Sequence, residues 1–211
     1  MMPSTLPRVH LVTDPSAGCD LVAKVAAALR GLPPRIVAVQ FRSRGTPGRE
    51  LLATARALRE VVGEAGQLLL VNDRVDVALA AGADGVHLPA AGIPPGEARR
   101  LLGTGVVAVS CHSAADVLRA RDGGADFATF GPIFDTPSKR GYGAPVGLDR
   151  LREASALGLP LVGLGGIDLG NACSVLDAGA YGVAAIRAWL EAEDPGVVVR
   201  AFLAAAKTRT G

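Results

Sequence analysis

The sequence predicts a closed (β/α)8 barrel, formed as one domain over residues 1–211, and three observations carry this prediction. Short apolar runs alternate with helix-like segments along the chain, which is typical of a parallel sheet. Eight strand-then-helix units can be counted, the number that closes a barrel. Hydrophobic residues make up 49% of the chain and aromatic residues only 4%. Small aliphatic side chains must therefore fill many short buried strands.

The first four strands are expected where runs of Val, Leu and Ile stop at polar residues or Pro. They span residues 8–13, 36–42, 68–71 and 85–88. The helices between them carry apolar residues at helical spacing, as Leu51, Ala55 and Leu58 do, and stop at Pro33-Pro34 or at a glycine such as Gly63. These helices are expected over residues 21–32, 47–62, 75–81 and 95–102.

The second half of the chain continues the alternation. Strands are expected over residues 106–110, 126–130, 159–164 and 181–185. Helices are expected over residues 114–121, 148–156, 171–178, 186–191 and 196–207. A long loop, residues 131–145, follows the sixth strand, and loops of this length usually have a function.

An internal repeat supports the barrel. Residues 81–86, 123–128 and 178–183 have similar sequences, and each joins the end of a helix to the next strand. A glycine in each repeat is expected to take the left-handed conformation that ends a helix. An open doubly wound sheet is the alternative, and it is disfavoured because no Gly-x-Gly-x-x-Gly follows the first strand.

Charge and cysteine content narrow the class of protein. The net charge is +2 with no basic block, which argues against nucleic acid and membrane surfaces as partners. The apolar runs are too short to cross a bilayer, and residues 1–7 do not read as a secretory signal. Three unpaired cysteines suit a reducing compartment. We therefore expect a cytoplasmic protein with a small-molecule substrate, and a homo-oligomer is compatible with the sequence.

Glycines and a short helix near the end of the chain predict a phosphate site. Gly165 and Gly166 follow the seventh strand, and Ala185 and Ile186 end the eighth. In a barrel these loops and the extra helix bind phosphate through backbone N–H groups. The alternative is that the glycines only make a tight turn.

Polar residues at the ends of the second and third strands predict a second anion site. Gln40, Arg42 and Arg44 share one side of their strand, and guanidinium and amide groups suit a diphosphate or carboxylate. Asn72 and Asp73 follow the third strand. Asp73 fits either a helix N-cap or a Mg²⁺ ligand that works together with substrate phosphates.

The fifth strand and the loop after the sixth strand add candidate catalytic groups. Ser110 and His112 share one side, and a histidine at a strand end can move protons. The alternative is that Ser113 caps the next helix and His112 only covers it. Cys111 is expected to be buried and inert, and His10 and His87 to lie inside the barrel. In the loop, hydroxyl groups and a cation for phosphate are offered by Thr136, Ser138 and Lys139. Tyr142 of the same loop is either a lid residue or a surface residue.

Seven short segments occur together in one order: residues 11–14, 40–42, 71–74, 83–88, 110–112, 131–139 and 165–167. With these segments the chain resembles the thiamine phosphate synthase and TenI family of (β/α)8 barrels along nearly its whole length. In the synthases, the resemblance implies, Gln40, Arg42 and Arg44 grip a pyrimidine diphosphate, and Asn72 and Asp73 help hold the diphosphate and Mg²⁺.

The resemblance also assigns the remaining site residues. Ser110, Thr136, Ser138 and Lys139 fall on positions that bind the two substrates. Gly165 and Gly166, with the backbone near Ala185 and Ile186, fall on the thiazole phosphate site. The implied reaction expels diphosphate and leaves a cation on the pyrimidine methylene, so it needs neutralisation of the leaving group.

One segment departs from the synthase pattern. Synthases usually follow His-Leu with Gly-Gln-x-Asp-Leu-Pro, whose Asp is a second metal ligand, whereas this chain has Ala90 and Gly92 at the Gln and Asp positions. TenI-type members resemble thiazole tautomerases, which move a proton with a histidine at the position of His112 and need no metal. We therefore favour a metal-independent tautomerase with His112, Arg42, Ser110 and Lys139 as catalytic residues. A Mg²⁺-dependent synthase is the alternative, and a non-catalytic thiazole phosphate-binding regulator is a second one.

Overall fold

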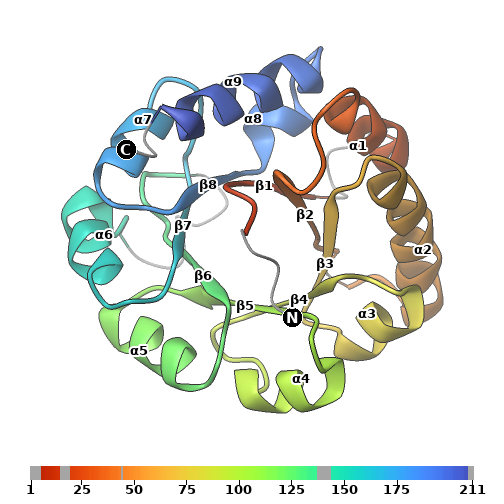
Figure 1. The fold of residues 1–211 in the computed structure, drawn as a ribbon, viewed down its shortest axis with the longest axis horizontal. Helices are drawn as coiled ribbons and strands as arrows, with labels where there is room; N and C mark the ends of the chain where they lie inside the picture. The colour runs from red at the N-terminus through yellow and green to blue at the C-terminus, as the bar shows by residue number, and fades with distance from the viewer. Residues whose placement is uncertain (1–5, 15–19, 44, 137–143, 209–211) are drawn as a thin grey trace.

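Eight parallel strands close into a barrel in the computed structural model, which describes residues 6–14, 20–43, 45–136 and 144–208 (Figure 1). Each strand pairs with the next, and β1 pairs with β8, as at His10 with Ala184. The strands are β1 Val9–Val12, β2 Val37–Phe41, β3 Leu68–Asn72, β4 Gly85–Leu88, β5 Val106–Cys111, β6 Phe127–Phe130, β7 Leu161–Leu164 and β8 Gly182–Ala185. The predicted barrel is confirmed, and the open sheet is excluded.

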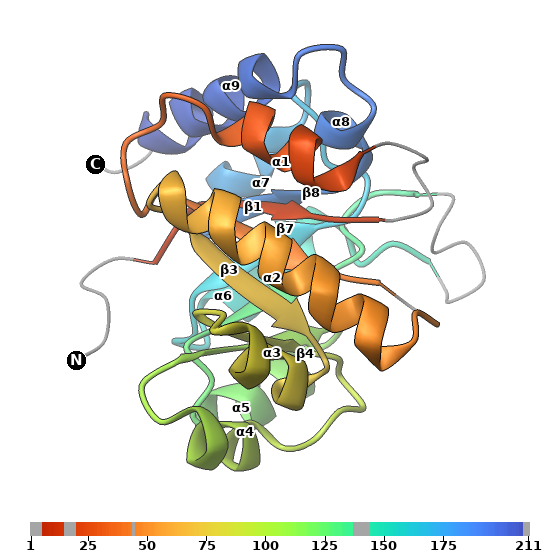
Figure 2. The same ribbon diagram turned by 90° about the vertical axis from the view of Figure 1, so that its right-hand side faces the viewer.

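Helices surround the barrel, and α1 and α2 lie along its outer surface (Figure 2). They are α1 Leu21–Leu29, α2 Gly48–Glu64, α3 Val75–Ala81, α4 Pro95–Leu102, α5 Ala114–Asp122, α6 Gly147–Ser155, α7 Ala172–Asp177, α8 Arg187–Leu190 and α9 Pro195–Lys207.

Two predicted helix ends differ from the observed ones by more than one residue. The first helix stops three residues before the expected Leu32, because Gly31 has φ +71° and the chain already turns there. The second helix runs through Gly63, and the left-handed residue that follows it is Gly66, with φ +67°.

The strands divide their side chains between two cores, as the period of two requires. Val37, Val39 and Phe41 of β2 face the helices, whereas Ala38 packs inside the barrel and Gln40 faces its mouth. The inner core consists of Val12, Ala38, Leu68, Leu70, Val106, Ala108, Phe127, Val162 and Ala184. The predicted parity of Gln40 and Arg42 is therefore confirmed, since both line the cavity described below.

The internal repeat has the structural role that its position predicted. Gly82, Gly124 and Gly179, the second residue of each repeat, have φ of +65°, +81° and +93°. Two of the repeats add a carboxylate that ties neighbouring strands together. Asp84 accepts the Leu69 N–H at 2.8 Å, and Asp126 accepts the Val107 N–H at 2.7 Å.

Within the described part of the chain, no helix combines the length and the apolar character that crossing a membrane requires.

Candidate active site

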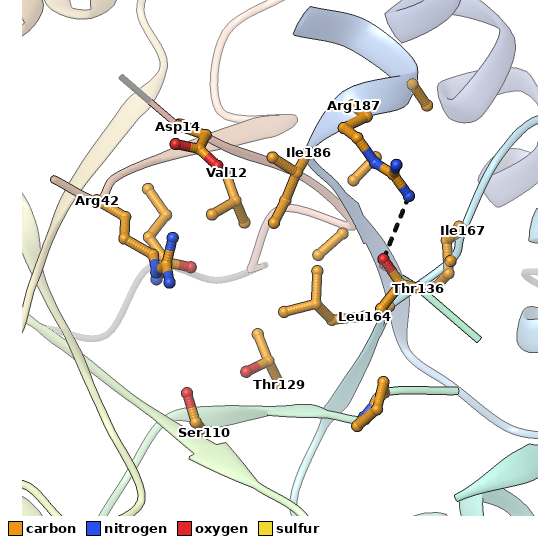
Figure 3. Close-up of a pocket in the computed structure, with 18 of the residues that line it drawn as sticks. Val12, Asp14, Arg42, Ser110, Thr129, Thr136, Leu164, Ile167, Ile186 and Arg187 are labelled. Atoms are coloured by element: carbon orange, nitrogen blue, oxygen red, sulfur yellow. Dashed lines mark hydrogen bonds between the residues drawn. The ribbon is translucent and has the colours of Figure 1, made fainter. Parts of the chain in front are cut away.

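A cavity of about 680 Å³ opens at the carboxyl ends of the strands. This is the end of a (β/α)8 barrel where active sites lie. Residues from strands on all sides line it, and Figure 3 shows Arg42 and Arg187 on opposite sides of the space. Four predicted residues form what we call the backbone wall: Gly165, Gly166, Ala185 and Ile186. Four polar side chains form what we call the side-chain wall: Gln40, Arg42, Asn72 and His87.

The side-chain wall is held by hydrogen bonds between neighbouring strands. The buried Gln40 side chain donates from Nε2 to Asn72 Oδ1 at 2.9 Å. The backbone of Arg42 is fixed by the fully buried Thr13, whose Oγ1 accepts the Arg42 N–H at 2.9 Å and donates to the Arg42 carbonyl at 3.2 Å. These bonds fix the direction in which the Arg42 side chain leaves the strand.

His87 is a neutral member of this wall. Its Nε2 lies 3.1 Å from the Thr129 hydroxyl. Burial lowers its pKa to about 3, and the charges of His10 and Arg42 act in the same direction. His10 lies beside it inside the barrel, 4.8 Å from the Phe127 ring, and burial lowers its pKa to about 4. Both predicted interior positions are confirmed.

His112 lies at the cavity with one ring nitrogen already bonded. Its Nδ1 is 2.5 Å from the Gly131 carbonyl oxygen. A carbonyl can only accept, so Nδ1 carries the proton and a neutral ring has Nε2 as its acceptor. Ser113 also caps α5 as expected, because its Oγ accepts the Asp116 N–H at 3.2 Å. The capping interpretation and a role for His112 in the cavity are therefore compatible.

Ser110 and Cys111 behave as their opposite parity predicted. Ser110 is half-buried and lines the cavity. The Cys111 side chain is fully buried, and burial raises its thiol pKa to about 12, with the charge of Asp116 adding to the shift. A thiol with this pKa is not a nucleophile at neutral pH.

The backbone wall depends on glycine for two reasons. Gly165 and Gly166 have φ of +103° and +65°, which L-residues rarely adopt. A Cβ on Gly165 would lie 2.6 Å from Pro132 Cα, and one on Gly166 would lie 2.7 Å from the Asp135 carbonyl oxygen. The tight-turn interpretation is therefore correct, and it is compatible with phosphate binding. Among the described residues, the N–H groups of Gly166 and Ile167 have no acceptor.

Several residues at the cavity escaped the sequence analysis: Asp14, Thr129, Asp135, Asp168, Arg187 and Glu191. Asp14 lies two residues after the end of β1, so its position near a strand end was a usable signal. Arg187 follows Ile186, but no parity rule extends from a strand into a new helix. Its Nη2 donates to Oγ1 of the predicted Thr136 at 3.3 Å (Figure 3).

Asp73 is placed differently from the other predicted residues. It is exposed, has φ +66°, and is not among the residues that line the cavity. The N-cap interpretation is wrong, because the N-cap residue of α3 is Arg74 and no side chain caps this helix. Arg44, Ser138, Lys139 and Tyr142 lie outside the described residues.

The described residues bring together no group of three His, Cys, Asp or Glu side chains suited to a metal ion. The segment that departs from the synthase pattern, residues 89–92, contributes no carboxylate to such a group. Pro89 to Gly92 form a turn in which the Gly92 N–H donates to the Pro89 carbonyl at 2.9 Å. A Cβ on Gly92 would lie 2.9 Å from Pro89 Cδ, so this turn holds no side chain at that position without moving.

Comparisons with known proteins agree on one family. The family model described as thiamine monophosphate synthase matches residues 9–189. A thiamine-phosphate synthase of Methanoculleus marisnigri is 46% identical over 204 residues, which cover 94% of this chain and 96% of the relative. One of Roseiflexus sp. is 43% identical, over 92% and 83%. The solved structure of a thiamine phosphate pyrophosphorylase from Pyrococcus furiosus is similar with a TM-score of 0.85 and 32% identity, covering 97% of each chain.

Proposed function

We propose, from the premise that this chain belongs to the thiamine monophosphate synthase family, that it couples a pyrimidine diphosphate with a thiazole phosphate and releases diphosphate. This is the alternative of the sequence analysis, and it replaces the tautomerase as the preferred reaction because the named relatives are synthases. The observation that carries the proposal is the pair of walls. A reaction between two phosphorylated substrates needs two anion sites, and the two walls that line the cavity would each supply one.

The coupling can be written for the groups that the cavity presents. The bond between the pyrimidine methylene and the diphosphate oxygen breaks, and its electron pair leaves with the diphosphate. The thiazole nitrogen then donates its lone pair to the methylene carbon and forms the new C–N bond. Arg42 is placed to neutralise charge that builds up on the leaving group, while Gln40 and Asn72 orient it.

The backbone wall would hold the other substrate. N–H groups near Gly166 and Ile167 suit a phosphomonoester, and the cavity between the walls is lined by Val12, Leu164 and Ile186, which suit a heterocycle (Figure 3). Holding the two substrates face to face removes most of the entropic cost of their encounter.

Asp73 is exposed and does not itself line the cavity, but it directly follows Asn72, which does. If magnesium binds there, this one carboxylate would hold it together with substrate phosphate oxygens, which is a common arrangement for this metal. Magnesium, when bound, supplies positive charge to the departing diphosphate. The turn from Pro89 to Gly92 offers no second carboxylate. We therefore expect most of the ion's remaining ligands to come from diphosphate and water.

His112 has no proton to move in this coupling, and it is the observation that favours a second candidate function. Its Nε2 is an acceptor beside the cavity, as proton removal from a thiazole carboxylate phosphate requires. A tautomerase activity would use the same phosphate anchor and no metal.

Two assays on one preparation test these functions. The first follows diphosphate release from both substrates, with Mg²⁺ and with a chelator, and the second follows aromatisation of the thiazole carboxylate phosphate by absorbance. We expect Mg²⁺-dependent release that Asp73→Asn greatly reduces and His112→Gln largely retains. Aromatisation that His112→Gln removes, without any diphosphate release, would overturn the proposal in favour of the tautomerase. Tight thiazole phosphate binding with neither activity would indicate a silent binding protein.

A further inference from the structure

Arg187 is a cation at the cavity to which neither the sequence analysis nor the comparisons assign a role. It is the first residue of α8, and its exposed side chain lines the cavity beside the backbone wall. Its guanidinium points across to the loop after β6, where Nη2 donates to Thr136 Oγ1 at 3.3 Å (Figure 3). This hydrogen bond is long and goes to a neutral hydroxyl, so it leaves the charge of Arg187 uncompensated.

No carboxylate oxygen among the described residues lies within 4.0 Å of the Arg187 guanidinium. Asp135, Asp168 and Glu191 also line the cavity, but none of these described residues forms an ion pair with Arg187. Oδ1 of Asp168 accepts the N–H groups of Gly170 at 2.9 Å and Asn171 at 3.1 Å instead. The pattern differs on the outer surface, where Arg152 pairs with Asp149 at 2.7 Å. Arg187 therefore keeps a full positive charge at a site where no acidic side chain of the described chain neutralises it.

Arg42 and Arg187 stand on opposite walls of one cavity (Figure 3). Each of the two proposed substrates carries one phosphate-type group, so the described part of the cavity provides one guanidinium for each anion. A guanidinium binds phosphate through two parallel N–H donors and adds a full positive charge, which backbone N–H groups do not carry.

We infer that Arg187 is a specificity-determining residue that binds the phosphomonoester of the thiazole substrate and selects it over the unphosphorylated alcohol. The inference rests on the proposed function for the identity of this substrate. The backbone N–H groups near Gly166 hold the phosphate from one side, and Arg187 closes the site from α8. Its bond to Thr136 keeps the side chain extended over the cavity before the substrate binds.

Equilibrium binding by calorimetry, without the pyrimidine substrate, tests this directly. The ligands are thiazole phosphate and the corresponding thiazole alcohol, and the proteins are wild type, Arg187→Gln, Arg187→Lys and Arg200→Gln. Arg200 is an exposed arginine of α9 outside the cavity, so its substitution makes the same change in net charge. Thermal melts confirm that all variants are folded.

We expect Arg187→Gln to weaken thiazole phosphate binding about tenfold, as loss of one charge-assisted contact at an exposed position should. Alcohol binding should stay within about twofold, Arg187→Lys should be intermediate, and Arg200→Gln should match wild type. Raising the salt concentration from about 50 mM to about 500 mM should weaken phosphate binding more in wild type than in Arg187→Gln.

Three results would overturn the inference: a wild type without preference for the phosphate, unchanged phosphate binding in Arg187→Gln, or equal weakening of phosphate and alcohol. The proposed function can fail separately. If wild type binds thiazole phosphate through Arg187 and yet releases no diphosphate when both substrates and Mg²⁺ are present, the coupling reaction is wrong and the role of Arg187 stands.

Discussion

The two walls of the cavity are built in different ways. The side-chain wall presents two amides, a guanidinium and an imidazole, from residues that lie in the strand ladders or, for Arg42, directly after β2. The backbone wall presents peptide groups from loops, and its glycines are packed against Pro132 and Asp135 of another loop. A substitution in the first wall removes a functional group and leaves the scaffold intact. A substitution in the second moves the scaffold itself.

Because of this difference, substitutions in the two walls should affect different properties, activity in one case and stability in the other. The half-buried Arg42 and Asn72 side chains border the open cavity, so removing one of them costs the fold little. Residues with positive φ and no room for a Cβ have no such freedom. We therefore expect substitutions in the side-chain wall to lower activity more than stability, and substitutions at the glycines of the backbone wall to lower stability first.

Neutralising Arg42 should give the largest effect on activity. We expect Arg42→Met to lower kcat/KM for diphosphate release by about 10²- to 10³-fold, because a leaving diphosphate would lose a positioned cation. The free energy of unfolding should change by less than about 1 kcal/mol. Steady-state kinetics and urea unfolding check both parts. If Arg42→Met lowers the free energy of unfolding by several kcal/mol as well as lowering kcat/KM, the distinction between the two walls is wrong.

Gly165→Ala should give the largest effect on stability. Its φ of +103° and the 2.6 Å approach to Pro132 Cα combine strain with a collision, and we expect a loss of about 3 kcal/mol. Urea unfolding should show a lower midpoint with an unchanged slope.

Gly124→Ala is the matched control, because Gly124 has φ +81° with nothing within 4 Å of the added Cβ. It should lose only about 1 kcal/mol. Equal losses in the two variants would mean that the collision with Pro132 is relieved without cost.

Acid should weaken the barrel interior at the side-chain wall and below it. His10 and His87 have folded-state pKa values of about 4 and about 3, below the ordinary 6.5, so the unfolded chain takes up protons first as the pH falls. Stability is therefore full above pH 6.5 and is lost as the pH falls towards 3–4. Each imidazole should lower the free energy of unfolding by about 2 kcal/mol at pH 5 relative to pH 7.5.

Urea unfolding at the two pH values measures this loss. The single variants His10→Gln and His87→Gln should each remove about half of it, and the double variant should remove most of it. If the double variant is as acid-sensitive as wild type, the two imidazoles are not the groups that titrate.

Thr13→Val should give the smallest effect on activity. It leaves the Arg42 N–H without its acceptor, which we expect to cost about 1–2 kcal/mol in stability, and it loosens the direction of Arg42, which should lower kcat/KM a few-fold. The control is Thr54→Val, whose hydroxyl only donates to Glu50 within α2. A kcat/KM that is unchanged although stability falls would show that Arg42 does not depend on Thr13 for its position.

Much of the fold followed from local patterns. Parity placed Gln40 and Arg42 at the cavity and Val39 and Phe41 under the helices, because alternation along a strand is a property of the backbone itself. The repeats placed left-handed glycines at three helix ends, since few other residues adopt that conformation.

The choice between reactions did not follow from such patterns. Gly92 lacks the carboxylate of the synthase pattern, and this one position favoured a tautomerase. The named relatives, similar over nearly the whole chain, favour a synthase instead. One missing ligand is weak evidence for a metal whose other ligands are substrate oxygens and water, because those ligands leave no mark in a sequence.

By itself, then, the amino-acid sequence determined the alternation of strands and helices, the side of each strand that faces the cavity, and the glycines that end helices, all of which depend on neighbours within a few residues. Only the tertiary structure decided that His112 bonds Gly131, that Thr13 holds Arg42, and that Arg187 reaches Thr136. These pairs are 19, 29 and 51 residues apart. Which of them meet depends on how the closed barrel brings its loops together at one end, which no local pattern encodes.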